Sequence, residues 1–360
     1  YIGVIGSRRK VAAVNAQLRE MGFEVTERFA RFLRGEPQTQ LTVRFKREGV
    51  ADSLMEVKLT RANIALPAVP YYTLLSDSTG YIILNSFTEN CARDVRLALV
   101  ELRNQGARGL ILDLRGNGGG SLSEAVDIAG LFVPKGTEVV STKGKIAQAA
   151  QTFKTQREPL DLQIPLVVLV DGQSASASEI VAGAMQDLDR GIILGRRTYG
   201  KGLVQAVRNL PYNASLKVTT SKYYTPSGRC VQAIDYARRG EDGSVERIPD
   251  SLTTVYYTRA GRPVRDGGGI TPDIEVQAER LPNLLYYLAN DDVLFDFATQ
   301  YVIKHPEIGS VESFELTAQD YADFKAMLKK RNFTYDRQSE ALLKNLKEMA
   351  EFEGYMESAS

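Results

Sequence analysis

The chain has 360 residues, 43% hydrophobic and 25% charged, which is enough to bury a full core in two or three compact units. Its 45 basic and 44 acidic residues leave a formal net charge of +1, so no broad field would attract nucleic acid or a membrane surface. No apolar run approaches the roughly 20 residues that a spanning helix needs. Partners must therefore be predicted from individual sites.

Cysteine and histidine are scarce, and this restricts the chemistry. Cys91 and Cys230 lie far apart, so we interpret them as two unpaired thiols rather than a disulfide framework or a thiolate metal cluster. The single histidine, His305, precedes a proline and has no glycine-flanked serine or second metal ligand near it. A Ser-His-Asp triad or a His-rich zinc site would depend on that one residue, so we expect neither. We expect no metal and no cofactor.

The first 62 residues predict a small β-rich module. Short β-like runs cover residues 41–45 and 55–59, and one helical stretch lies near residues 24–34. The following residues repeat a strand, loop and helix order, beginning with the strand at 80–84, which is typical of an α/β layer architecture. We expect this second unit to carry the chemistry.

Two apolar strands of the second unit lead into small-residue loops. Residues 110–114 form one strand, which enters the loop Arg115–Gly120 before a helix capped by Ser121. The second strand, 164–170, is almost continuously apolar and is followed by Gln173–Glu179, which opens another helix.

The rest of the chain predicts a hairpin and then helices. Residues 207–224 indicate a hairpin around Pro211–Asn213, and Gly267–Asp273 forms a turn. From about residue 281 the pattern is helical and charged, with apolar residues at helical spacing: Phe324, Met327, Leu328, Leu342, Leu343 and Leu346. These helices are the expected contact surface of a homo-oligomer.

Ser176 is a candidate nucleophile because of where it stands. A serine at the turn from a buried strand into a helix exposes its hydroxyl beside the free N–H groups of the helix. Its small neighbours would let a substrate backbone approach, and the N–H of Ala177 could donate to an oxyanion. Taken alone, the segment fits an ordinary Ser/Ala-rich helix cap equally well.

Lys201 is a candidate base because it lies between Gly200 and Gly202. A lysine acts as a base only when neutral, which requires burial or lost solvation to lower its pKa from about 10.4. If the segment is a strand, its period of two places Lys201, Leu203 and Gln205 on one face, so Gln205 could orient the amine. The alternative is an exposed turn lysine.

The segment Gly195–Lys201 also has the spacing of a phosphate-binding loop, so nucleotide binding is a further alternative. Gly202 stands where such a loop needs a magnesium-binding Ser or Thr, and a strand rather than a helix is predicted to follow. We therefore disfavour this interpretation.

Taken together, five segments in this order resemble the C-terminal processing peptidases, also called tail-specific proteases, over most of residues 1–280. These segments are Leu112–Gly120, Ser174–Ile180, Gly200–Gln205, Lys222–Arg229 and Gly268–Asp273. The resemblance implies that Ser176 is the nucleophile, Lys201 the general base and Gln205 the third member of a triad. It also implies an oxyanion hole made by the backbone N–H groups of Ala177 and Gly120, with Gly119 as the second choice for the glycine.

The resemblance implies an α/β fold with a crotonase/ClpP-like catalytic core, an N-terminal PDZ-like domain and a helical C-terminal extension. We expect these at residues 1–62 (PDZ-like), 63–280 (peptidase core) and 281–360 (helical extension). The PDZ-like segment is shorter than the resemblance implies, and we hypothesise that a stretch of about 20 to 30 residues is missing between Lys10 and Val11, because a PDZ-sized unit needs more chain.

The expected function is that of a serine endopeptidase that recognises the C-terminal region of protein substrates and acts through a Ser/Lys acyl-enzyme. A catalytically silent PDZ-containing binding scaffold is the alternative. The resemblance places the protein outside the cytoplasm, in a bacterial periplasm or cell envelope near membranes, with a leader removed ahead of Tyr1. We expect protein or peptide C-termini as partners and no nucleic acid.

Overall fold

The computed structural model describes residues 33, 35–46, 54–63, 66–145, 148, 150–212, 214–239, 245–277, 281–310, 314–335 and 337–355. Most of the helical stretch expected near residues 24–34, and the hypothesised gap between Lys10 and Val11, lie outside the described residues. The chain divides into two compact units, Ala65–Ala278 and a second unit of Tyr1–Ile64 with Glu279–Ser360.

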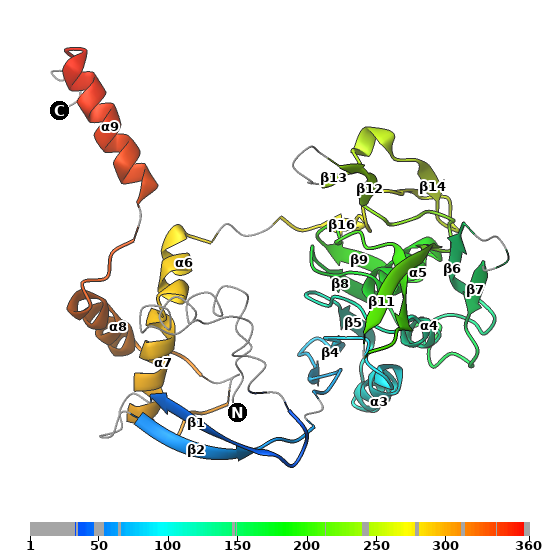
Figure 1. Cartoon of the computed structure of the whole chain (residues 1–360), viewed down its shortest axis with the longest axis horizontal. Coiled ribbons are helices and arrows are strands. Elements are labelled where there is room, and N and C mark those ends of the chain that lie inside the picture. The colour runs from blue at the N-terminus through cyan, green and yellow to red at the C-terminus, as the bar shows by residue number, and fades with distance from the viewer. Residues whose placement is uncertain are drawn as a thin grey trace. The chain divides into compact units, whose positions relative to one another are not determined.

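A six-stranded sheet is the centre of the unit Ala65–Ala278 (Figure 1). Its neighbouring strands are parallel except for the edge strand β3, which is antiparallel to β4. The strand order is β16-β9-β8-β5-β4-β3, with bounds β3 (Tyr71–Leu74), β4 (Thr79–Ile83), β5 (Gly109–Asp113), β8 (Leu166–Val170), β9 (Ile192–Gly195) and β16 (Ile274–Glu275). The predicted apolar strands at 80–84, 110–114 and 164–170 are confirmed as β4, β5 and β8.

A helix follows each of three parallel strands: α3 (Cys91–Asn104) follows β4, α4 (Leu122–Ala129) follows β5, and α5 (Ala177–Asp187) follows β8. Helix α3 buries Val95, Leu99 and Leu102, whose spacing of three and four residues places them on one face. Every residue of α5 is buried, so this helix lies inside the unit rather than on its surface.

A second, antiparallel sheet has the strand order β10-β11-β6-β7, with bounds β6 (Glu138–Gly144), β7 (Gln151–Lys154), β10 (Leu203–Asn209) and β11 (Ser215–Tyr224). Leu203 pairs with Lys222 and Asn209 with Ser215, which confirms the predicted hairpin. Two short antiparallel pairs and a 3-10 turn complete the unit: β12 (Ile234–Arg239) with β13 (Val245–Arg247), η2 (Asp250–Leu252), and β14 (Val255–Tyr257) with β15 (Pro263–Arg265).

Buried charges join the carboxyl end of α5 to the chain that follows β11. Arg229 is 1% exposed and donates to Oδ1 of Asp187 at 2.7 Å and to Oε1 of Gln186 at 2.7 Å. Arg262 donates to Asp189 at 2.6 Å and to Asp273 at 2.5 Å. The buried Arg229 therefore has a carboxylate partner, as a charged group removed from water requires, and the partly exposed Arg262 has two.

The second unit contains one described strand pair and four described helices. Strands β1 (Gln40–Lys46) and β2 (Leu54–Thr60) are antiparallel, as the two β-like runs predicted, and the helices are α6 (Asn283–Asn290), α7 (Val293–Lys304), α8 (Ala318–Lys330) and α9 (Gln338–Phe352). His305 directly follows α7, and its ring stacks on Tyr301 at a centroid distance of 4.3 Å.

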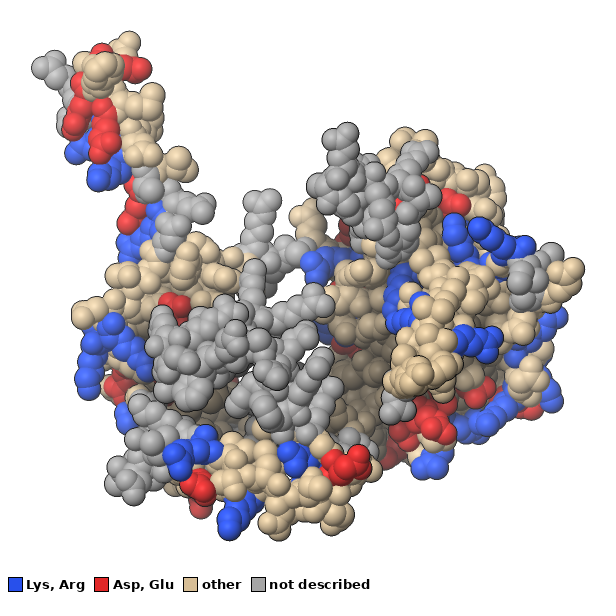
Figure 2. Space-filling view, in the orientation of Figure 1, with Lys and Arg blue, Asp and Glu red and all other residues tan. Residues whose placement is uncertain are grey.

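Basic and acidic side chains both occur on the described surface of each unit, as Figure 2 shows for one face. Among the helices that the structure describes, none combines the length and the apolar character needed to cross a membrane.

Candidate active site

The carboxyl ends of three adjacent parallel strands bring the site together. Strand β5 ends before the glycine loop Arg115–Gly120, β8 ends before Asp171–Ser176, and β9 ends before Arg196–Lys201. These strands neighbour one another in the order β9-β8-β5. A crevice beyond the carboxyl ends of parallel strands is the usual place for a site in an open α/β sheet.

Ser176 is held in a strained backbone conformation immediately before helix α5. Its φ of 58° and ψ of −112° are unfavourable for a residue with a side chain. Strain of this kind costs about 1–3 kcal/mol and persists only where surrounding contacts hold it. In α/β-hydrolases, a strained strand-to-helix turn of this kind exposes the hydroxyl of the nucleophilic serine.

Asn117 ties the glycine loop to the turn that contains Ser176. Its side chain is fully buried, donates to the carbonyl of Leu84 at 2.7 Å and accepts from the N–H of Gly119 at 2.9 Å. Its own carbonyl accepts from the N–H of Ala175 at 3.0 Å and from Ser178 Oγ at 2.9 Å. One residue therefore fixes the distance between the two segments.

Gly119 approaches the serine turn so closely that no side chain fits. A Cβ built on it would lie 2.6 Å from the carbonyl oxygen of Ala175 and 2.8 Å from Ser176 Cβ, and its φ is +98°. The N–H of Gly119 already donates to Asn117, which favours Gly120 over Gly119 as the candidate oxyanion donor. Gly120 pairs with Phe87 as an isolated parallel bridge, so its own N–H points away from Phe87.

Glu179 is the buried acid of the site. Its Oε1 accepts from Thr198 Oγ1 at 2.6 Å and from the N–H of Gly200 at 2.7 Å, and its Oε2 accepts from the N–H groups of Ser176 at 2.9 Å and Lys201 at 2.8 Å. Burial raises the pKa of Glu179 above its usual value, although these four hydrogen bonds act in the opposite direction.

The glycines beside Lys201 let the backbone pass close to another segment. A Cβ on Gly200 would lie 2.2 Å from Ala233 Cβ, and one on Gly202 would lie 2.7 Å from the N–H nitrogen of Gln232. Two hydrogen bonds hold this contact. The N–H of Ala233 donates to the carbonyl of Gly200, and the N–H of Gly202 donates to the side-chain oxygen Oε1 of Gln232. The two glycines thus permit a close backbone contact that larger residues would block.

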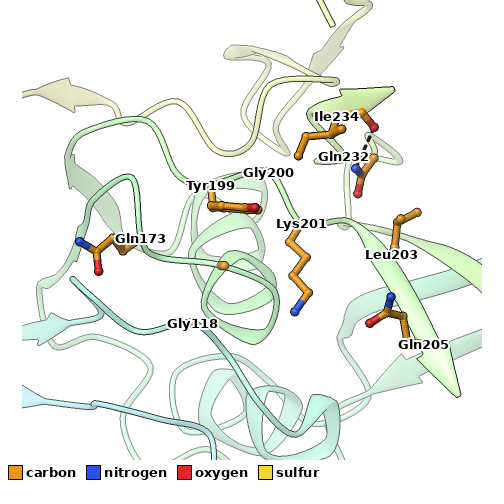
Figure 3. A pocket seen from close by; sticks show the side chains of 10 residues that line it. Gly118, Gln173, Tyr199, Gly200, Lys201, Leu203, Gln205, Gln232 and Ile234 are labelled. Atoms are coloured by element: carbon orange, nitrogen blue, oxygen red, sulfur yellow. Dashed lines mark hydrogen bonds between the residues drawn. The ribbon is translucent and has the colours of Figure 1, made fainter. Parts of the chain in front are cut away.

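Lys201, Leu203 and Gln205 line one cavity of about 370 Å³, as the period of two predicted. Figure 3 shows the Lys201 side chain extending into this cavity, whose other lining residues include Gly118, Gln173, Ala175, Tyr199, Gln232 and Ile234. Strand β10 itself begins only at Leu203.

Lys201 adopts the second of the two states considered from the sequence. Its side chain is exposed rather than desolvated. Among the described residues, the lysine amine makes no hydrogen bond to Ser176 or to Gln205. The backbone of the pair is in place, but the side-chain contact between base and nucleophile is not made.

An ion pair supports the start of the glycine loop. Arg115 donates to Asp113 through Nη2 at 2.6 Å, and Tyr81 Oη donates to the same carboxylate at 2.6 Å. Burial on its own would raise the pKa of Asp113, but the hydrogen bonds from Arg115 and Tyr81 outweigh it and hold the pKa below its usual value.

The phosphate-binding alternative does not fit the geometry. The residues after Lys201 form strand β10, whereas a phosphate-binding loop leads into a helix.

Sequence reasoning assigned no role to Asn117, Glu179 or Tyr223, although each contacts the segments of the site. The spacing of Ser176 and Glu179 is that of a capping box, which could have indicated that Glu179 binds the serine's N–H. Asn117 and Tyr223 lie within the family-like segments Leu112–Gly120 and Lys222–Arg229, but local spacing does not predict their contacts because their partners belong to distant segments.

A strained serine before a buried helix, a glycine loop bonded to its turn and a lysine on the neighbouring loop are features that a serine hydrolase requires. Residues 78–237 match the model of peptidase family S41. Residues 284–360 match a model described as the C-terminal helical domain of a probable PDZ-protease.

Individual relatives carry names of the same kind. The chain is 39% identical to a carboxy-terminal-processing protease of Bartonella bacilliformis over 56% of this chain and 46% of that protein. It is 40% identical to a carboxyl-terminal-processing protease of Synechocystis sp. over 54% of this chain and 45% of that protein. A solved structure, a photosystem II D1 C-terminal processing protease, matches with 29% identity and a TM-score of 0.45, covering 70% of this chain and 59% of that one. The chain spans about half the length of the curated relatives it matches.

Proposed function

We propose that this protein is a serine endopeptidase that recognises the C-terminal region of protein substrates, with Ser176 as nucleophile and Lys201 as general base. The observation that carries the proposal is the shared anchoring of the two residues: a strained Ser176 and Lys201 bond to one carboxylate oxygen of Glu179 beside a single cavity. The names of the relatives support a protein substrate cut near its C-terminus.

The reaction begins when a substrate segment occupies the cavity. Ser176 Oγ attacks the scissile carbonyl carbon while the neutral amine of Lys201 takes the hydroxyl proton, and this proton then passes to the leaving amine as the C–N bond breaks. Water, deprotonated by the same amine, hydrolyses the acyl-enzyme and releases Ser176. The N–H groups of Ala177 and Gly120 would donate to the oxyanion that forms at each addition step.

The exposed Lys201 must lose contact with water before it can act as a base. We propose that a bound substrate covers the cavity, that the amine then turns to Ser176 Oγ, and that Gln205 orients it from the same wall. Excluding water disfavours the ammonium form, which lowers the pKa of a lysine. The arrangement described here is thus a resting conformation in this proposal.

The finer domain assignment is also a proposal. Residues 63–280 would be a crotonase/ClpP-like peptidase core, residues 1–62 a PDZ-like domain that takes a substrate C-terminus as an added strand, and residues 281–360 a helical extension that joins copies of the chain. The proposal includes a location in the periplasm or cell envelope.

The test is cleavage of a purified, unfolded reporter protein that ends in an apolar tail, with the same reporter ending in two aspartates for comparison. Wild type should cleave the apolar-tailed reporter preferentially, and Ser176→Ala and Lys201→Ala should each lose about 10⁴-fold or more of the activity. Ser215→Ala and Lys217→Ala, which alter exposed residues of β11, are the matched controls and should cleave like wild type.

Equal cleavage by wild type, Ser176→Ala and Lys201→Ala would remove the assignment. Binding of the apolar tail with no cleavage by any of them would support the binding scaffold instead. Cleavage that ignores the tail would keep the peptidase and reject C-terminal recognition.

A further inference from the structure

Tyr223 contacts the two proposed catalytic residues through their carbonyl groups. It lies on β11 and is 2% exposed. Its hydroxyl donates to the carbonyl oxygen of Lys201 in a short hydrogen bond and lies 3.2 Å from the carbonyl oxygen of Ser176. One phenolic hydrogen is thus shared between the peptide groups of the nucleophile and the base.

These contacts complement those of Glu179. Glu179 accepts from the N–H groups of Ser176 and Lys201, and Tyr223 donates to their C=O groups. Two buried side chains therefore bind both polar backbone groups of both residues. Ser176 and Lys201 are thus linked twice, once by the acceptor Glu179 and once by the donor Tyr223.

The two linked backbones both need such support. Ser176 has a φ of 58°, which a residue with a Cβ adopts only under constraint. Lys201 lies between two glycines, whose backbones have the widest conformational freedom, and Gly200 itself has a φ of +86°. The carbonyl of Ser176 also accepts from the N–H groups of Glu179 and Ile180, so helix α5 holds Ser176, and the bonds from Tyr223 and Glu179 tie Lys201 to it.

The hydroxyl of Tyr223 is suited to a permanent donor role. Burial and the nearby carboxylate of Glu179 raise its pKa well above the usual value, so it stays protonated over the neutral range. Packing alone would be satisfied by phenylalanine, whereas a buried hydroxyl is unfavourable unless it has a hydrogen-bond partner. Its partners here are the carbonyls of Ser176 and Lys201.

We propose that Tyr223 is a positioning residue that sets the distance between Ser176 and Lys201 by joining their carbonyl groups. This inference rests on the proposed function, since it assigns a role in the same reaction. It concerns alignment of nucleophile and base, so it predicts an effect on turnover rather than on substrate binding.

The experiment compares Tyr223→Phe with Tyr224→Phe. Each substitution removes one hydroxyl and keeps the aromatic ring, and the two residues are adjacent on β11. Tyr224 lies against Lys143, whose amine is 4.9 Å from the centroid of the Tyr224 ring. Competent sites are counted by stoichiometric labelling of Ser176 with a fluorophosphonate, and kcat is expressed per labelled site. Tyr223→Phe should lower kcat by about 10- to 100-fold, as small misplacements of reacting groups do, and leave KM within about 3-fold. Tyr224→Phe should retain both constants within about 2-fold of wild type.

If Tyr223→Phe keeps the wild-type kcat per labelled site, this inference is overturned. The proposed function still stands in that case, provided that Ser176→Ala is inactive. A loss of activity explained wholly by fewer labelled sites also overturns the inference, because the effect is then on folding alone. If Tyr223→Phe does not fold, 3-fluorotyrosine at position 223 provides a stronger donor of nearly the same size. An unchanged kcat in that protein overturns the proposal, and a change of at least about 2-fold at constant KM supports it.

Discussion

Ser176 and Lys201 donate their backbone N–H groups to the same atom, Oε2 of Glu179, at 2.9 and 2.8 Å. The serine precedes helix α5 and the lysine follows strand β9, so this single oxygen joins two loops that leave neighbouring strands of the sheet. Because the second oxygen, Oε1, binds Thr198 and Gly200, the carboxylate has no freedom to rotate. The position of Lys201 relative to Ser176 is therefore fixed through the main chain.

Replacing Glu179 by glutamine should abolish most activity. One oxygen becomes an NH₂ group that cannot accept, so two of the four donors lose their acceptor whichever way the amide lies. We expect kcat to fall at least about 100-fold. We also expect a loss of about 1–3 kcal/mol for each buried donor left unpaired, partly offset because a neutral amide costs less to bury. Reporter cleavage and urea unfolding measure the two effects.

Glu124→Gln is the matched control for that change. Glu124 also binds two backbone N–H groups, those of Asn90 and Ala92 at 2.9 Å each, but it holds the start of α3 instead of Ser176 and Lys201. It should lose some stability and keep kcat within about 2-fold. Equal losses of kcat in the two variants would contradict the role given to Glu179.

Gly119→Ala should separate the glycine loop from the serine turn. The added methyl would lie 2.6 Å from the Ala175 carbonyl oxygen, and a φ of +98° is strained for alanine in any surroundings. We expect kcat to fall about 100-fold or more, with a loss of about 1–3 kcal/mol in the free energy of unfolding.

Gly118→Ala tests whether the Gly119 effect depends on position. A Cβ on Gly118 would meet no heavy atom within 4 Å, and its φ is not positive. This variant should keep the stability of wild type within about 0.5 kcal/mol. Similar destabilisation in both variants would mean that the loop, rather than its contact with Ser176, is sensitive.

Local pattern was sufficient to predict the strands, the hairpin and the shared face of Lys201, Leu203 and Gln205, because each depends on neighbours in sequence. The contacts of Asn117 and Tyr223 could not be predicted in this way, since they join residues from different strands after folding. The choice between a buried and an exposed Lys201 stayed open for a related reason. Burial of a lysine depends on what covers the cavity, and the sequence around Lys201 does not specify that.

Arg229→Met should strongly destabilise the unit Ala65–Ala278. The side chains of Arg229 and Asp187 are 1% and 0% exposed, so removing the cation leaves Asp187 buried without its charge partner. Breaking a buried pair in this way costs about 3–5 kcal/mol. Lys135→Met, which removes an exposed pair with Glu158 at 3.8 Å, should cost at most about 1 kcal/mol. Similar midpoints in urea for both variants would show that the Arg229 pair is not needed for stability.

Asp113 should give the protein a specific sensitivity to acid. Its pKa is lowered in the folded chain, so its ionised form contributes stability above the unfolded pKa of about 4, and that contribution disappears as the pH falls through the lower folded value. Asp113→Asn should therefore be less stable than wild type by about 1–3 kcal/mol at pH 7, and the difference should shrink toward pH 3. Urea unfolding at pH 7, 5 and 3 measures this, with Asp127→Asn on α4 as the control at each pH. A difference between wild type and Asp113→Asn that stays constant from pH 7 to pH 3 would mean that the stabilisation comes from the shape of the side chain and not from its charge.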